Sequence, residues 1–298
     1  MRTRDWLLLI LLAVLWGFSY FFVAIALKGG VPPLTLVLAR VSLAALVLVP
    51  VALAFGYAMP SGWANWRLFA VQSVLNNVFP FSMMVYGQTK IGSSLASVLN
   101  ATTPLFTLLV ARVLAGEPLT FNRTAGVLFG LAGVGILVGP EIAGSNLGTL
   151  LGMSAFLGAA LFYGISAQWM KRLREVPPIV SAASQLTCSS IIMLPIAAVT
   201  ERFWQLPVPP VYVLASVVGV ALLATALAYI VFFKISASAG PQNVMLVTLL
   251  IPVSASALGV IFLGEALTVH QVLGAIVIAF GLLVVDGRVL SYLPLRAR

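Results

Sequence analysis

Few side chains in this sequence could carry out acid–base, metal or nucleophilic chemistry, and their spacing does not group them. The acids and the one histidine fall at or near the ends of apolar segments: Asp5, Glu117, Glu141, Glu175, Glu201, Glu265, Asp286 and His270. Catalysis needs ionisable groups that converge on one site. The single cysteine, Cys188, rules out an internal disulfide and a cysteine-rich metal site. We therefore predict no enzyme activity, no metal and no cofactor.

Arg40 is the one charged residue that lies well inside an apolar segment. A guanidinium group can bind two carboxylate or phosphate oxygens at once, so Arg40 could anchor an acidic group of a small molecule. The alternative is structural, because the long side chain could extend to the nearby membrane interface or donate to backbone carbonyls. The sequence leaves both interpretations open.

Two adjacent amides precede a proline in the third apolar segment, in the run Asn76-Asn77-Val78-Phe79-Pro80. Because proline has no N–H, the carbonyl of Asn76 loses its helical partner and the helix is expected to kink there. Two amides beside a freed carbonyl could bind an ammonium or a carboxylate group. They could equally hold neighbouring helices together through hydrogen bonds.

Prolines also interrupt two later segments, where Asn100 precedes Pro104 and Thr248 precedes Pro252. With Pro80, we predict these prolines to be hinges for gating. An apolar cavity with a few polar groups is the usual small-molecule site, although aromatic residues can instead form a belt at the membrane interface. The remaining residues predicted to line a cavity are Trp16, Tyr20, Phe79, Tyr86, Tyr163, Gln185, Tyr229 and Met245.

The elements that must position these residues are membrane-spanning helices. Hydrophobic residues make up 61% of the chain and charged residues 8%, whereas soluble domains carry about 25% charged residues. A span needs about 20 apolar residues, and a helix satisfies its own backbone groups in lipid. We predict ten spans: 5–27, 35–55, 66–89, 92–115, 123–139, 147–170, 177–199, 209–234, 240–263 and 269–287. The first is longer than the apolar core of a signal peptide, so we expect a retained helix.

Lysine and arginine are distributed unequally between the two sides of these spans. If the N-terminus is cytoplasmic and the spans alternate, twelve basic residues face the cytoplasm, and only Lys28, Lys90 and Arg202 face outward. This bias predicts a multi-pass inner (plasma) membrane protein with both termini in the cytoplasm. Topology therefore accounts for the net charge of +9, and we expect the lipid bilayer and not a nucleic acid as partner.

The sequence also contains an internal repeat. Residues 116–120 read Gly-Glu-Pro-Leu-Thr and residues 264–268 read Gly-Glu-Ala-Leu-Thr, at an offset of 148 (264 − 116) that also relates Pro104 to Pro252. Earlier in each half, an offset of 145 (185 − 40) relates Arg40 to Gln185. Each half has five spans, an odd number, so the second half enters the membrane in the opposite direction. We predict an all-α fold of ten transmembrane helices in two inverted five-helix repeats, 1–145 and 146–298. Inverted repeats offer a route to alternating access.

Two repeated features have structural interpretations. Glu117 and Glu265 occupy equivalent turns, where an acid favours the N-terminus of a helix, and we predict that both are structural or close a gate. The segments 126–139 and 274–287 carry glycines at helical spacing, which favours close helix packing. The packing could be internal or between subunits, so the protein is expected to be a monomer or a weak homodimer.

The chain resembles the drug/metabolite transporter superfamily, in its EamA-type branch. The resemblance rests on Trp16-Gly17 with Ser19 in the first span, the prolines of the fourth and ninth spans, the paired Gly-Glu turns and the glycine-rich fifth and tenth spans. It covers essentially the whole chain. Within this branch the sequence is most similar to YddG-type amino-acid exporters. That resemblance implies export of amino acids or related metabolites across the inner membrane.

We therefore predict an alternating-access exporter of small metabolites, with neutral or aromatic amino acids as the leading substrates. Proton-coupled carriers commonly titrate an Asp, Glu or His inside the membrane, and none is evident here, which favours a facilitative carrier. One alternative is an organic-anion carrier for nucleotide sugars or sugar phosphates, which would need several cations in its cavity. Another is a membrane-embedded lipid-handling protein or enzyme.

Overall fold

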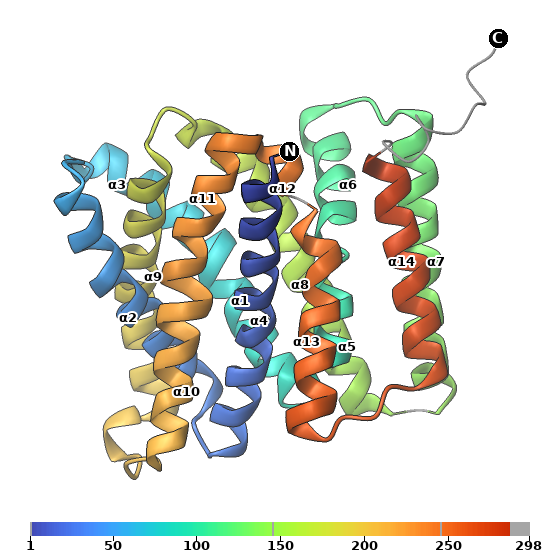
Figure 1. Ribbon diagram of the computed structural model, residues 1–298. Coiled ribbons are helices and arrows are strands. Elements are labelled where there is room, and N and C mark those ends of the chain that lie inside the picture. Colours follow the sequence, from blue (N-terminus) through green and yellow to red (C-terminus); the bar gives the residue numbers. More distant parts are fainter. Residues whose placement is uncertain (1, 145, 245, 287–298) are drawn as a thin grey trace.

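The computed structural model describes residues 2–144, 146–244 and 246–286, and every regular element within them is helical. Met245, one of the predicted cavity residues, lies outside this part of the chain. The helices run side by side in Figure 1, and the loops alternate between its upper and lower ends. The upper end, where α1 starts, is called the N-terminal face below, and the lower end is called the distal face.

Each half of the described chain forms five spans. Those of the first half are α1 (Thr3–Lys28); α2 (Pro33–Ala54); α3 (Trp63–Ser73), η1 (Val74–Val78) and α4 (Phe79–Gln88); α5 (Ser93–Asn100) and α6 (Thr103–Ala115); and α7 (Phe121–Ala143). Those of the second half are α8 (Leu147–Met170); α9 (Pro178–Glu201); α10 (Val211–Ala221), η4 (Leu222–Leu227) and α11 (Ala228–Ala239); α12 (Pro241–Val244) and α13 (Val247–Leu263); and α14 (Val269–Asp286).

Nine of these spans are long and apolar enough to cross a membrane, and the tenth contains the shorter apolar helix α13. The predicted fold class, ten transmembrane helices in two inverted five-helix repeats, is confirmed. Local sequence explains many of the helix ends. Helices α2 and α9 begin at Pro33 and Pro178, since proline fits the first turn of a helix. Helices α6 and α13 are each followed directly by a glycine, Gly116 and Gly264, whose φ angles of 66° and 68° suit glycine.

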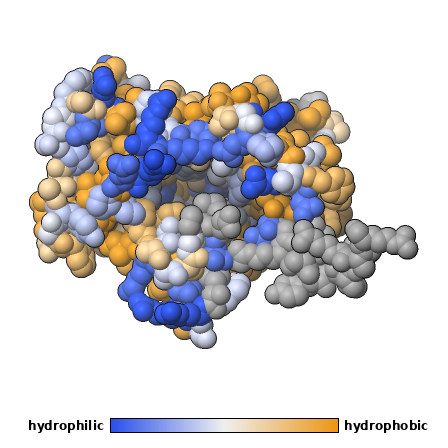
Figure 2. All heavy atoms as spheres, turned by 90° about the horizontal axis from the view of Figure 1, so that it is seen from above, coloured by the Kyte–Doolittle hydropathy of each residue, from blue (hydrophilic) through white to orange (hydrophobic). Residues whose placement is uncertain are grey.

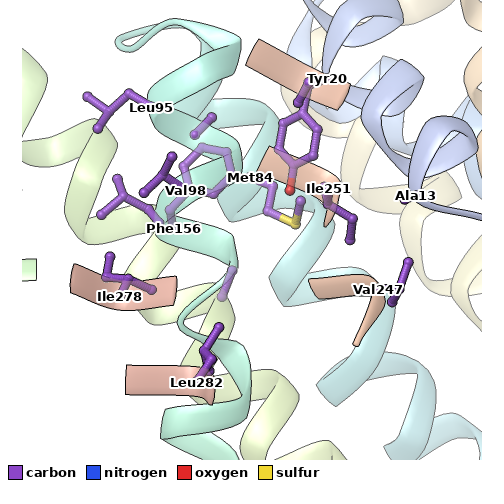
Figure 3. Packing of buried hydrophobic residues seen from close by; sticks show 14 of the residues in the cluster. Ala13, Tyr20, Met84, Leu95, Val98, Phe156, Val247, Ile251, Ile278 and Leu282 are labelled. Carbon is purple, nitrogen blue, oxygen red and sulfur yellow. The ribbon is translucent and has the colours of Figure 1, made fainter. Parts of the chain in front are cut away.

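The spans pack into a bundle with α1 near its middle. Helix α1 contacts α10, α11 and α13, while α2 packs on α9 and both α4 and α6 pack on α8. Figure 3 shows part of the larger apolar core, where Tyr20 of α1, Met84 of α4 and Phe156 of α8 lie together. The rings of Tyr20 and Phe156 stack with centroids 6.4 Å apart. Helices from both halves therefore share one core.

Helices α7 and α14 form a close antiparallel pair at one side of the bundle (Figure 1). Gly126 faces the backbone of Gly281, and Gly133 faces that of Gly274. A Cβ atom added at Gly133 would lie 2.9 Å from the carbonyl oxygen of Gly274, so the helices pack closer than side chains would allow. The sequence allowed these glycines to pack within the chain or between subunits. In the structure they pack within the chain.

Candidate functional site

The third span changes its helical pattern directly before Pro80. Because proline cannot donate, the helix adopts a short π-helical segment, η1, in which the N–H of Phe79 donates to the carbonyl of Val74, five residues earlier. The expected break at Pro80 is therefore present, as a π segment. Asn76 and Asn77 lie within η1. Short π segments inside helices are frequent at functional sites.

Asn76 is the centre of a group of hydrogen-bonded polar side chains. Its Nδ2 atom donates to Oε1 of Gln185 (3.1 Å) and to the hydroxyl of Tyr229 (3.3 Å). Its Oδ1 atom accepts from the hydroxyl of Ser166 (3.0 Å), which in turn accepts from Nε2 of Gln72 (2.9 Å). These five residues, called the amide cluster below, come from α3, η1, α8, α9 and α11. The cluster therefore joins the two halves of the chain.

Asn77 has a different environment. It is fully buried, and its Nδ2 atom donates to the hydroxyl of Ser189 on α9 at 2.9 Å. The Ser189 hydroxyl donates to the carbonyl of Gln185 at 2.7 Å. Asn77 thus links η1 to α9, while the partly buried Asn76 holds the amide cluster.

Arg40 is buried, with 6% of its surface exposed. Its Nε atom donates to the hydroxyl of Thr225 at 2.9 Å, and its guanidinium lies 3.9 Å from the ring centroid of Phe81. Thr225 belongs to the second π-helical segment, η4, and donates to the carbonyl of Val220, five residues earlier, at 2.8 Å. The side chain is therefore directed to Thr225, inside the bundle. It does not take the predicted alternative of extending toward the membrane interface.

The two sets of contacts are related by the internal repeat. The π segments begin at Val74 and Leu222, an offset of 148 (222 − 74). Arg40 and Gln185 are equivalent residues of α2 and α9, and each contacts a π segment of the opposite half. The contacts are similar in position, but one uses a guanidinium and the other an amide. The two halves therefore place different chemistry at equivalent points of the interface between them.

Other predicted cavity residues surround this centre at varying distances. The ring of Trp16 lies 5.8 Å from that of Phe232, and the Tyr163 hydroxyl donates to the sulfur of Met84 at 3.4 Å. The Oδ1 atom of Asn100 is buried and has no hydrogen-bond partner among the described residues. These three residues lie on spans around the amide cluster, and none of their hydrogen bonds within the described residues is to a member of the cluster.

Three predicted residues lie apart from the amide cluster. Phe79 and Tyr86 share one side of α4, where they are 47% and 42% exposed. Thr248 lines an apolar cavity of ≈ 200 Å³ between α5, α13 and α14, next to Pro252.

The equivalent prolines Pro104 and Pro252, both predicted as hinges, have different positions in their helices. Pro104 stands in the first turn of α6 after a helix break, whereas α13 continues through Pro252.

Two acidic residues bind helix N-termini at the distal face. Glu265 accepts from the N–H groups of Ser93 (2.6 Å) and Ser94 (2.8 Å), at the start of α5. Glu201 likewise accepts from the N–H groups of Leu34 (2.9 Å) and Thr35 (2.6 Å) near the start of α2. Both acids belong to the second half and both helices to the first. Carboxylates stabilise helix N-termini through charge and hydrogen bonding, so these contacts tie the halves together.

The N-terminal face has a weaker connection. Glu117, the repeat equivalent of Glu265, forms an exposed ion pair with Lys171 at 2.6 Å. The hydrogen bond from Lys171, and then its charge, hold the pKa of the Glu117 carboxyl below its usual value. Exposed ion pairs of this kind contribute little to stability. Figure 2, which looks onto this face, shows hydrophilic residues around a hollowed centre.

Sequence reasoning missed several residues of this centre, namely Gln72, Phe81, Ser166, Ser189 and Thr225. None of them carries a charge, and no motif marks them. The one signal in the sequence is the offset of 148, which makes Thr225 the repeat equivalent of Asn77 (225 − 77). Arg40, Asn76, Gln185 and Tyr229 were predicted, and each belongs either to the amide cluster or to the contacts around Arg40.

Comparisons with known proteins agree with this architecture. The chain is 27% identical over 96% of its length to the "Uncharacterized transporter YvbV" of Bacillus subtilis (strain 168), of which 92% is covered. It is 24% identical to a "Probable amino-acid metabolite efflux pump" of Escherichia coli (strain K12) and to another of Salmonella typhimurium, covering 95% of this chain and 94% of each relative.

A crystal structure matches with a TM-score of 0.70 at 20% identity, covering 100% of both chains, which supports the fold alone. The model of the EamA-like transporter family matches twice, at residues 5–139 and 150–285. Its two matches fall on the two five-helix halves. The chain therefore belongs to the EamA-like transporter family, and it is a multi-pass membrane transporter.

Proposed function

We propose that the protein exports small amino-acid-type metabolites, with neutral or aromatic amino acids as the leading substrates. The observation that carries this proposal is the amide cluster, in which amides and hydroxyls from both halves converge within an apolar bundle. Such groups satisfy one another when no substrate is bound, and they can both donate to a carboxylate and accept from an ammonium. The bacterial relatives named as amino-acid metabolite efflux pumps support the same substrate class.

Alternating access between the two repeats, 1–145 and 146–298, would move this substrate. The amide cluster lies between them, and the contacts of Glu265 and Glu201 hold the distal face together. In the orientation predicted from basic residues, the hollowed N-terminal face is cytoplasmic. Substrate would then enter from the cytoplasm and leave across the distal face after the halves rearrange.

The driving force in this proposal is the substrate's own gradient. All seven acids lie in the first or last turns of helices or in the connecting segments, so none is placed to carry a proton through the middle of the bundle. A carrier of this kind equilibrates substrate. It does not accumulate it.

Transport by purified protein in proteoliposomes tests the proposal. Wild-type protein is expected to equilibrate labelled leucine or phenylalanine, without accumulation under an imposed pH gradient, and to leave sugar phosphates untransported. Absence of transport for every amino acid would end the proposal, and accumulation driven by the pH gradient would end its facilitative part.

A matched pair of serines on α8 tests the amide cluster itself. Ser166→Ala removes the hydroxyl that bonds Asn76, and is expected to raise KM about fivefold, as for the loss of a neutral hydrogen bond. Ser154→Ala removes an exposed hydroxyl that bonds only its own helix at Leu151, and should leave KM unchanged. Equal KM values for the two variants would remove the cluster from substrate binding.

A further inference from the structure

Arg40 is a buried cation without an acidic partner. A charge removed from water is costly unless it is paired. The seven acids are accounted for at the ends of the spans, and the salt bridge within the described residues joins Lys171 to Glu117. The protein partners of Arg40 are neutral: the hydroxyl of Thr225 and the ring of Phe81. The fold therefore holds an uncompensated positive charge at the interface between its halves.

The guanidinium is also held in one orientation. Thr225 accepts from its Nε atom, and the hydroxyl of Thr225 is itself fixed by donating to the carbonyl of Val220 within the π segment. The ring of Phe81 lies against the guanidinium at 3.9 Å. Together these contacts occupy one edge and one face of the planar group. No group of the described residues accepts from its two η nitrogens.

The partner of Arg40 and a member of the amide cluster lie close together in the same span. Tyr229 follows Thr225, which bonds Arg40, by four residues (229 − 225), and its hydroxyl accepts from Asn76 at 3.3 Å. A molecule bound at the free η nitrogens would therefore lie beside the amide cluster. The cation and the neutral polar groups form two ends of one candidate site.

We propose that Arg40 binds the carboxylate of the transported molecule, and that Thr225 and Phe81 are positioning residues that aim its η nitrogens. The proposal rests on the proposed function and narrows it to substrates with a free carboxylate and no net positive charge. Two parallel N–H···O bonds from a guanidinium give both attraction and orientation to a carboxylate. A site that contains one arginine and no acid rejects amines that lack this group.

The decisive comparison is between an amino acid and its amide. Counterflow in proteoliposomes is measured for phenylalanine and for phenylalaninamide, which replaces the carboxylate with a neutral group. Wild-type protein is expected to prefer the acid at least tenfold in Vmax/KM. Arg40→Gln is expected to raise KM for phenylalanine at least tenfold, about 1.4 kcal/mol, and to abolish the preference.

Arg40→Lys keeps the charge but loses the planar pair of donors. It tests carboxylate binding by Arg40 if Arg40→Gln fails to fold. It is expected to transport phenylalanine with a raised KM and a nearly normal Vmax. If wild-type protein transports acid and amide equally well, or if Arg40→Lys leaves KM unchanged, the inference is overturned while the proposed function stands. If wild-type protein transports neither phenylalanine nor any other amino acid, both fall.

The role of Thr225 has its own test. Thr225→Val removes the hydroxyl at constant shape and is expected to raise KM for phenylalanine about fivefold. Thr225→Ser keeps the hydroxyl and should restore the wild-type value. Ser216→Ala is the control, because this buried hydroxyl of α10 bonds only the carbonyl of Val213. A raised KM that serine does not restore would exclude positioning through the hydroxyl.

Discussion

At the scale of single residues, the neighbouring amides of η1 have different surroundings. Asn76 is partly buried and shares hydrogen bonds with three other side chains of the amide cluster. Asn77 is fully buried; its Nδ2 atom donates to Ser189 on α9, and its Oδ1 atom accepts from Asn76 at 3.3 Å. Both amides bond neighbouring helices, so both interpretations of the pair stay open. We propose a binding role for the partly buried Asn76 and a helix–helix role for Asn77.

We therefore expect Asn77→Ala to affect stability more than transport. Removing the amide leaves the Ser189 hydroxyl without its donor inside the bundle, at a cost on the order of 1 kcal/mol. The thermal unfolding midpoint of purified protein should fall. Asn65→Ala, which removes an exposed amide at the start of the same span, should leave it unchanged. A larger fall for Asn65→Ala would contradict this assignment.

The candidate site could be predicted only in part from the sequence. Arg40 stood out because a charge within an apolar segment is rare, and Asn76 because Pro80 follows it. Thr225 did not stand out, because a threonine in an apolar helix has no distinguishing signal. Its contact with Arg40 joins residues 185 positions apart, so it depends on how α2 and η4 pack.

At the scale of elements, the apolar segments predicted the spans well but not their internal breaks. The break at η1 follows from Pro80, which removes a donor from the helix. The break at η4 has no proline, because the equivalent residue is Ala228 (80 + 148). Its π geometry is supported by the hydroxyl of Thr225, which bonds the carbonyl of Val220. This bond lies within one span, between residues five positions apart, and no sequence motif marks it.

The close pair formed by α7 and α14 gives a prediction with a control on the same helix. Gly133→Leu would force a Cβ atom to within 2.9 Å of the Gly274 carbonyl oxygen, and overpacking costs about 1–3 kcal/mol. Gly135→Leu adds the same side chain where no atom lies within 4 Å. We expect the thermal unfolding midpoint to fall for Gly133→Leu alone. Equal effects would show that the pair is not closely packed.

At the scale of the whole molecule, the repeat supplies two similar halves, and we expect a few residues to decide which face is closed. Glu265 and its repeat equivalent Glu117 have the same sequence context but different partners. Glu265 binds the start of α5 in the opposite half, whereas Glu117 forms an exposed ion pair with Lys171. Charge-assisted bonds to a helix N-terminus are stronger than an exposed ion pair. This difference favours the state that is closed at the distal face.

We expect Glu265→Gln to open the distal face more often. The glutamine side chain has no negative charge and only one acceptor oxygen, whereas both oxygens of the Glu265 carboxylate accept from the N–H groups of Ser93 and Ser94. Ser97, one turn deeper on α5, is fully buried, so a cysteine placed there (Ser97→Cys, in a Cys188→Ser background) reports on opening. Its reaction rate with a bulky, membrane-impermeant maleimide should rise about tenfold, which corresponds to a shift of about 1.4 kcal/mol.

Glu141→Gln provides the control, because Glu141 lies in the last turn of α7, at the same face, and no described residue hydrogen-bonds its carboxylate. Its substitution should leave the labelling of Ser97→Cys at the wild-type rate. If Glu265→Gln also leaves that rate unchanged, the carboxylate is only a helix cap. A rise confined to Glu265→Gln would make it the residue that keeps the distal face closed while substrate enters from the other side.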